Sequence, residues 1–165
     1  MAGIFWHIPD SAVWTGDTNL LVGGTAAADT VYQSPGYEAD KAVDGNIGTR
    51  WQCYQYSAMP KWWRYDLGAG NEAAIDKLRM RGAGVFTPKN FNIEGSHTGS
   101  GDKPGTDWDI LYVAVGINST GWEEYIFTNN TAYRYYRLYI TSNQDGAPAG
   151  SDVLIYELEM MRQYT

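Results

Sequence analysis

The stretch AYRYYRLYIT, residues 132–141, decides the fold class of this chain. Successive side chains of a β-strand point to opposite faces, so residues two apart share a face. One face of this stretch collects Arg134, Tyr136, Leu138 and Ile140, and the opposite face collects Tyr133, Tyr135, Arg137 and Tyr139. Aromatic and β-branched residues favour strands. The stretch therefore predicts a strand with one apolar face.

Short apolar runs alternate with turn-rich segments on both sides of this stretch, which is typical of an all-β domain. No segment has an apolar period of 3.6 residues over three turns, so only a short helical turn near 38–43 is expected. In WWRYDLGAG, residues 62–70, alternation places Trp63, Tyr65 and Leu67 on one face. The other predicted strands are Ala74–Arg81, Asn90–Glu94, Ile110–Val115, Glu123–Phe127, Tyr133–Thr141 and Val153–Met161.

Length and composition indicate one globular domain that binds no nucleic acid. The chain has 165 residues, of which 44% are hydrophobic and 15% aromatic, so it can bury a sizeable core. Its net charge of −7 disfavours contact with phosphate backbones. The single cysteine, Cys53, excludes an intrachain disulfide and is interpreted as a small buried hydrophobic residue.

Residues 1–18 differ in pattern from residues 19–165, which we expect to form the sandwich. They include Phe5, Trp6 and Trp14 but show no strand alternation. We predict an N-terminal arm with hydrophobic anchors, which either attaches to a larger assembly or folds back over its own sandwich. The arm lacks the basic and continuous apolar regions of a signal peptide. No apolar run approaches the ~20 residues of a membrane span, so no membrane insertion is expected.

Two segments point to a cation. In KAVDGNIGTRW, residues 41–51, a tight turn brings the Asp44 carboxylate, the Thr49 hydroxyl and several carbonyls close together. Oxygen ligands of this kind suit a hard cation. In DVLIYELEM, residues 152–160, Glu157 interrupts an apolar strand. A carboxylate in such a place is costly unless it is paired or metal-bound.

Six segments in this order resemble the coagulation factor five/eight type C, or discoidin, family, which includes bacterial family 32 carbohydrate-binding modules. They are NLLVGGTAAAD (19–29), the DGN turn with Thr49 and Trp51, WWRYDLG (62–68), TPKNFNIEGS (87–96) with the following Trp108, YRYYRL (133–138) and IYELE (155–159). The resemblance covers about residues 19–163. It implies a galactose-binding-domain-like jelly-roll β-sandwich of two antiparallel sheets.

The resemblance also implies a structural calcium ion that joins the turn to the last strand. Its ligands would be the Lys41 carbonyl, the Asp44 carboxylate, the Asn46 carbonyl, the hydroxyl and carbonyl of Thr49, and the Glu157 carboxylate. Such an ion would give Glu157 a partner. Oxygen-only ligation suits calcium better than magnesium or zinc.

The resemblance further implies that loops at one end of the sandwich bind a sugar. Candidate ligand-binding residues are Gln52, Tyr54, Tyr56, Phe86, Lys89, Gln144 and Asp145. The tyrosines could stack on a sugar face. Gln52 occupies a position that is often His in galactose-binding relatives, which leaves the identity of the sugar open. For each candidate, an ordinary loop residue is the alternative.

The sequence thus favours a non-catalytic, lectin-like carbohydrate-binding or adhesion module, placed outside the cell or on a virion surface, with glycans or glycoconjugates as partners. The alternative is a structural or decoration protein, for instance of a phage virion, anchored by residues 1–18. An enzyme is not expected, because the chain has no H-E-x-x-H, G-x-S-x-G, P-loop or Rossmann motif.

Overall fold

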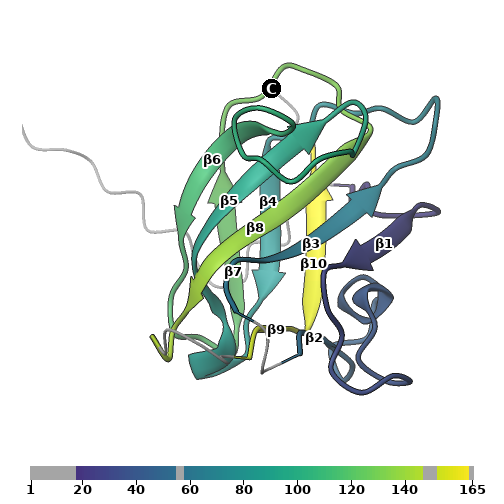
Figure 1. Cartoon of the computed structure of the whole chain (residues 1–165). Coiled ribbons are helices and arrows are strands. Elements are labelled where there is room, and N and C mark those ends of the chain that lie inside the picture. Colours follow the sequence, from purple (N-terminus) through teal and green to yellow (C-terminus); the bar gives the residue numbers. More distant parts are fainter. Residues whose placement is uncertain (1–17, 55–57, 147–151, 164–165) are drawn as a thin grey trace, which may run out of the picture.

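A computed structural model of the chain describes residues 18–54, 58–146 and 152–163, which form an all-β sandwich (Figure 1). One antiparallel sheet contains, in spatial order, β1 (Thr25–Ala28), β3 (Lys61–Asp66), β8 (Tyr135–Asn143), β5 (Pro88–Ser96) and β6 (Asp109–Val115). The second sheet contains β10 (Glu157–Met161), β4 (Lys77–Arg81) and β7 (Trp122–Ile126). A short pair joins β2 (Trp51–Gln52) to β9 (Leu154–Ile155), and two 3-10 turns are η1 (Ala39–Ala42) and η2 (Gly84–Phe86). The predicted all-β sandwich is confirmed.

The central strand β8 shows why the sheets pack as two layers. Tyr136, Leu138 and Ile140 are fully buried between the sheets, as the alternation predicts. Burying a large apolar side chain contributes about 1.5–3 kcal/mol, so this face drives the packing. The neighbouring strand β3 behaves in the same way, because Trp63 and Tyr65 point into the same core.

The outer face of β8 carries a buried ion pair instead of a solvated one. The Arg137 side chain is 2% exposed, and its Nε lies 2.6 Å from Oε2 of Glu94 on β5. The rings of Trp108 and Tyr139 lie 4.3 and 4.9 Å from the guanidinium and cover it. Two aromatic side chains thus shield a charge that strand alternation alone would expose.

Besides shifts of one or two residues at the ends of the other strands, the structure departs from the prediction in three places. The expected strand Val153–Met161 is two strands, because β9 pairs with β2 whereas β10 pairs with β4. The expected strand Ala74–Arg81 begins only at Lys77, since the Ile75 carbonyl accepts from the Asn129 side chain. β1 was not predicted, because its sequence TAAA has little strand preference.

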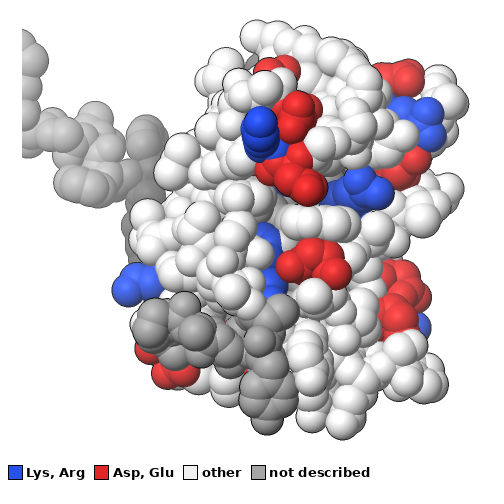
Figure 2. Space-filling model, viewed as in Figure 1, with Lys and Arg blue, Asp and Glu red and all other residues white. Residues whose placement is uncertain are grey.

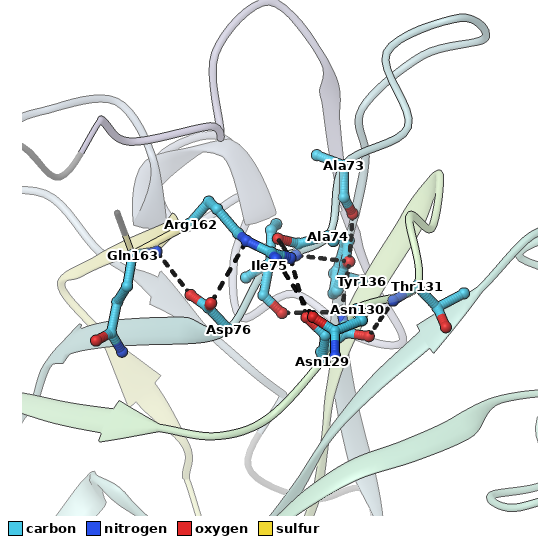
Figure 3. A network of polar contacts seen from close by, with 10 residues as sticks. All are labelled: Ala73, Ala74, Ile75, Asp76, Asn129, Asn130, Thr131, Tyr136, Arg162 and Gln163. Atoms are coloured by element: carbon cyan, nitrogen blue, oxygen red, sulfur yellow. Dashed lines mark hydrogen bonds and ion pairs between the residues drawn. The ribbon is translucent and has the colours of Figure 1, made fainter. Parts of the chain in front are cut away.

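A polar network secures the end of the sandwich opposite β2 and β9 (Figure 3). The Arg162 guanidinium donates to the Asn129 carbonyl (3.0 Å) and lies 3.6 Å from Oδ2 of Asp76. The Asn129 side chain donates to the Ile75 carbonyl (2.9 Å) and to the Tyr136 hydroxyl (3.3 Å). These contacts join the last strand to both sheets.

The predicted arm, residues 1–18, lies outside the described residues except for Thr18, so its attachment stays a prediction. The sandwich is anchored from Asn19, whose Oδ1 accepts the Met160 amide at 3.1 Å. Among the described residues, no helix has the length and apolar character that crossing a membrane requires.

Candidate functional site

The turn between η1 and β2 has a dense set of oxygen atoms. The Thr49 hydroxyl lies 2.8 Å from both Oδ1 of Asp44 and the carbonyl oxygen of Asn46. Oδ1 of Asp44 also accepts the Asn46 amide at 2.9 Å. Gly45 has φ +73°, a conformation that favours glycine and allows the chain to fold back here. The Lys41 ammonium lies 4.0 Å from Oδ2 of Asp44 at the start of the turn.

Glu157 at the start of β10 lies against this turn. Its side chain is nearly inaccessible, and Oε1 accepts the Gly45 amide at 3.3 Å. Oε2 is buried and has no hydrogen-bond partner among the described residues. Burial raises the pKa of Glu157 to about 7, and the charge of Asp44 adds to the shift. The structure therefore brings together the turn and the carboxylate that the sequence singled out.

The turn and Glu157 line an open cleft of about 520 Å³. Apolar walls come from Val22, Ile47, Tyr65 and Trp122, and further acidic groups from Asp40 and Glu159. Over residues 18–54, 58–146 and 152–163, no three His, Cys, Asp or Glu side chains gather in a way that would hold a metal. A cation here would thus rely on carbonyl and hydroxyl oxygens besides the two carboxylates.

The predicted ligand residues divide between two groups of loops. The first follows β2, at the lower end of the sandwich in Figure 1. Gln52 is buried, and its Oε1 accepts from Nε (3.3 Å) and an NH2 group (3.2 Å) of Arg50. Tyr54 is 44% exposed. Tyr56 lies outside the described residues.

The second group consists of η2 and the loop after β8, which are joined by hydrogen bonds. The amide of Asp145 donates to the Val85 carbonyl (3.0 Å), and the side chain of Gln144 donates to the Gly116 carbonyl (2.7 Å). Gln144 therefore has a structural contact, whereas Phe86, Lys89 and Asp145 present their side chains to solvent. The Asn143 side chain donates to the Asp152 carbonyl (2.7 Å), which ties this loop to the segment before β9.

An arginine that the sequence did not single out organises the first group. The Arg50 guanidinium lies 4.7 Å from the ring centroid of Tyr37 and 5.9 Å from that of Tyr156. The rings of Tyr32 and Tyr37 are themselves 5.7 Å apart. We call Tyr32, Tyr37, Arg50, Gln52, Asp152 and Tyr156 the Arg50 cluster.

Asp152 is the acidic member of the Arg50 cluster. Oδ1 of this residue is buried without a hydrogen-bond partner among the described residues. Burial raises the pKa of Asp152, while a hydrogen bond with Gln52 and the charge of Arg50 oppose the shift. Arg50 and Gln52 flank the buried Trp51 and so share a strand face, a pattern that could have revealed their contact. No local signal joins the tyrosines to Arg50, because they come from other segments of the chain.

Comparisons with known proteins agree with this architecture. A family model described as F5/8 type C domain matches residues 25–154. The chain is similar to the chitosan-binding module 2, solved with chitotriose, of a chitosanase/glucanase from Paenibacillus sp. IK-5. The two share 27% identity, the TM-score is 0.68, and the match covers 87% of this chain and 100% of that one. A search of curated proteins found no match.

Two further solved structures share the fold at lower identity. The family 32 CBM of NanJ from C. perfringens, in complex with galactose, is 15% identical with a TM-score of 0.71 over 88% of this chain and 99% of that one. A mutant of the lectin-binding domain of lectinolysin, complexed with Lewis b, is 18% identical with a TM-score of 0.67 over 89% and 97%.

Proposed function

The chain belongs to the F5/8 type C domain family, and from this premise we propose that it is a carbohydrate-binding domain without catalytic activity. The observation that carries the proposal is the Arg50 guanidinium, held at the surface between the Tyr37 ring and the Gln52 side chain. A donor fixed in this way loses little conformational entropy when it binds a hydroxyl group.

The neighbouring side chains suit a sugar in two complementary ways. The half-exposed ring of Tyr54 offers an apolar face for the C–H side of a pyranose. Arg50 supplies N–H donors for hydroxyl or carbonyl oxygens at the same end of the sandwich. Chitotriose, galactose and Lewis b, which the similar proteins bind, are the first ligands to test. We place the domain outside the cell, where such glycans occur.

The experiment is a binding screen on immobilised glycans with calcium present. The wild-type chain should bind at least one glycan, and Arg50→Ala should reduce that binding at least tenfold. Arg134→Ala is the matched control, because this half-exposed arginine pairs with Asp66 on another part of the sandwich. Failure of the wild-type chain to bind any glycan would overturn the proposal, as would equal losses in both variants. Release of sugar from a bound glycan would contradict the non-catalytic part.

We also propose that a calcium ion stabilises the fold at the Asp44–Thr49 turn. The residues present suit it: Oε2 of Glu157 is buried without a partner in the described part of the chain, and Asp44, Asn46 and Thr49 offer oxygen atoms beside it. The carbonyls of Lys41 and Thr49 would complete the set. The ion would neutralise two neighbouring carboxylates and tie the turn to β10. Anchoring on a larger assembly through residues 1–18 remains a separate prediction.

A further inference from the structure

Strand β6 is the edge of the five-stranded sheet. Within the described part of the chain it pairs with β5 alone, and Figure 1 shows it at the outer left of the sheet. The Gly116 amide donates to the Lys89 carbonyl of β5 at 2.7 Å. Because successive amides of a strand point in opposite directions, those of Ala114 and Tyr112 also face β5. The amides of Val113 and Val115 therefore face away from the sheet.

The surface around this edge is unusually apolar. Val113 is 69% exposed and Val115 is 66% exposed. Among the residues that the structure describes, eleven large hydrophobic side chains are exposed, and six of them lie on β6, just after it or on β7: Ile110, Tyr112, Val113, Val115, Ile117 and Ile126. Edge strands of monomeric proteins usually carry a lysine, a proline or a bulge that blocks pairing with another chain. In DILYVAV the one irregularity is a register shift near its start, and neither lysine nor proline is present.

The charges of the molecule avoid this edge. The chain has a net charge of −7, yet Asp109 is the only charged residue of β6 and stands at its first position. In Figure 2 the visible surface over β6 is white, while charged side chains gather over other parts of the face. Two copies of the chain could therefore approach here without bringing like charges together.

We propose that two copies of the chain dimerise by antiparallel pairing of their β6 strands about a two-fold axis at Val113. This axis places Val113 opposite Val113 of the partner and Leu111 opposite Val115. Apolar cross-strand pairs of this kind stabilise sheets. Each Asp109 then falls opposite position 117 of the other copy and not opposite its own counterpart. The two five-stranded sheets become one continuous sheet, and the outward amides of Val113 and Val115 gain acceptors.

The pairing has a consequence that rests on the proposed function. Antiparallel strands point the two sandwiches in opposite directions, so the loops after β2 and β8 come to opposite ends of the dimer. Such a dimer links two glycan-bearing surfaces, whereas a parallel arrangement would bind twice to one surface.

Sedimentation velocity of the full chain over a concentration series tests the pairing without any glycan. We expect a species of twice the 18.4 kDa chain mass. Val113→Lys places like charges opposite each other and should shift the dissociation constant upward by more than tenfold, with an unchanged melting temperature at dilutions where both proteins are monomeric. Val22→Lys is the matched control, since Val22 is 74% exposed and lies away from β6, and it should stay dimeric.

Val113→Cys examines the axis directly. Mild oxidation should join the two copies, because opposed Cα atoms of a strand pair lie within the range of a disulfide. Cys53 is buried and does not interfere. A wild-type monomer at every concentration, or a dimer that Val113→Lys leaves intact, overturns the proposal. A dimer that Val113→Cys fails to crosslink overturns the axis. A dimer that binds no glycan contradicts the proposed function and leaves the pairing in place.

Discussion

Glu157 on β10 accepts a hydrogen bond from the amide of Gly45 at 3.3 Å, although 112 residues separate the two in the chain. The other carboxylate oxygen of Glu157 is buried without a partner among the described residues. Leaving a buried charged oxygen unpaired is costly. The fold thus holds a carboxylate in a place where a cation would stabilise it.

Chelation should therefore destabilise the protein. At a calcium concentration one hundred times the Kd, binding adds about 2.7 kcal/mol to the free energy of unfolding. For a chain of this length, that corresponds to a rise in Tm of about 5–10 °C. We expect EDTA to lower Tm in a thermal melt by this amount, and excess calcium to restore it.

Variants of the two carboxylates should lose this response. Asp44→Ala and Glu157→Gln should melt at the same temperature with EDTA and with calcium. Glu159→Gln is the control, because Glu159 lies on the same strand but pairs with Arg79 at 3.0 Å, and it should keep the calcium response. A wild-type Tm that is equal in both conditions would exclude a bound ion.

The buried ion pair between Arg137 and Glu94 should contribute strongly to stability. Arg137→Ala leaves the Glu94 carboxylate buried and unpaired, so we expect the free energy of unfolding to fall by about 3–5 kcal/mol. Arg134→Ala breaks the half-exposed pair with Asp66 and should cost no more than about 1 kcal/mol. Urea titration of both variants gives the comparison. Similar losses would contradict the difference in burial.

The ring of Tyr54 should matter more for binding than its hydroxyl. Stacking of this kind contributes about 0.5–1.5 kcal/mol, so Tyr54→Ala should weaken the affinity for the glycan that the chain binds by about 2- to 13-fold. Tyr54→Phe keeps the ring and should retain the affinity. Isothermal titration calorimetry of the two variants separates the contributions. An equal loss in both variants would point to a hydrogen bond of the hydroxyl instead.

Cys53 should be an unreactive thiol in the folded protein. Burial raises its pKa to about 11, so little thiolate is present at pH 8. Reaction with a thiol reagent should be about 100-fold slower than for the chain unfolded in urea, which provides the reference rate. As the pH rises, the thiol ionises in the unfolded chain before it ionises in the folded protein. The stability that the buried, protonated thiol contributes is therefore complete below about pH 9 and is lost towards pH 11. Equal rates in both states would contradict the burial.

Several features were predictable because they depend on neighbours in the chain. The alternation of Tyr136, Leu138 and Ile140 placed three core residues, and the structure buries all of them. The hydrogen bonds within the Asp44–Thr49 turn are equally local. The break of the last strand at Tyr156 was not visible, because the pairing partner changes there from β2 to β4, and both of these strands lie far away in the chain.

The sequence by itself determined that the chain forms an all-β sandwich and which strand faces form its core, because side-chain direction alternates with every residue of a strand. Only the tertiary structure decided the environment of the residues that strand alternation directs outward. Arg137 is buried because Trp108 covers it, and Arg50 is held by tyrosines from two distant segments. Val113 is left exposed because β6 lies at the edge of its sheet. Such contacts depend on which segments the packing of the sheets brings together, and no local pattern encodes that.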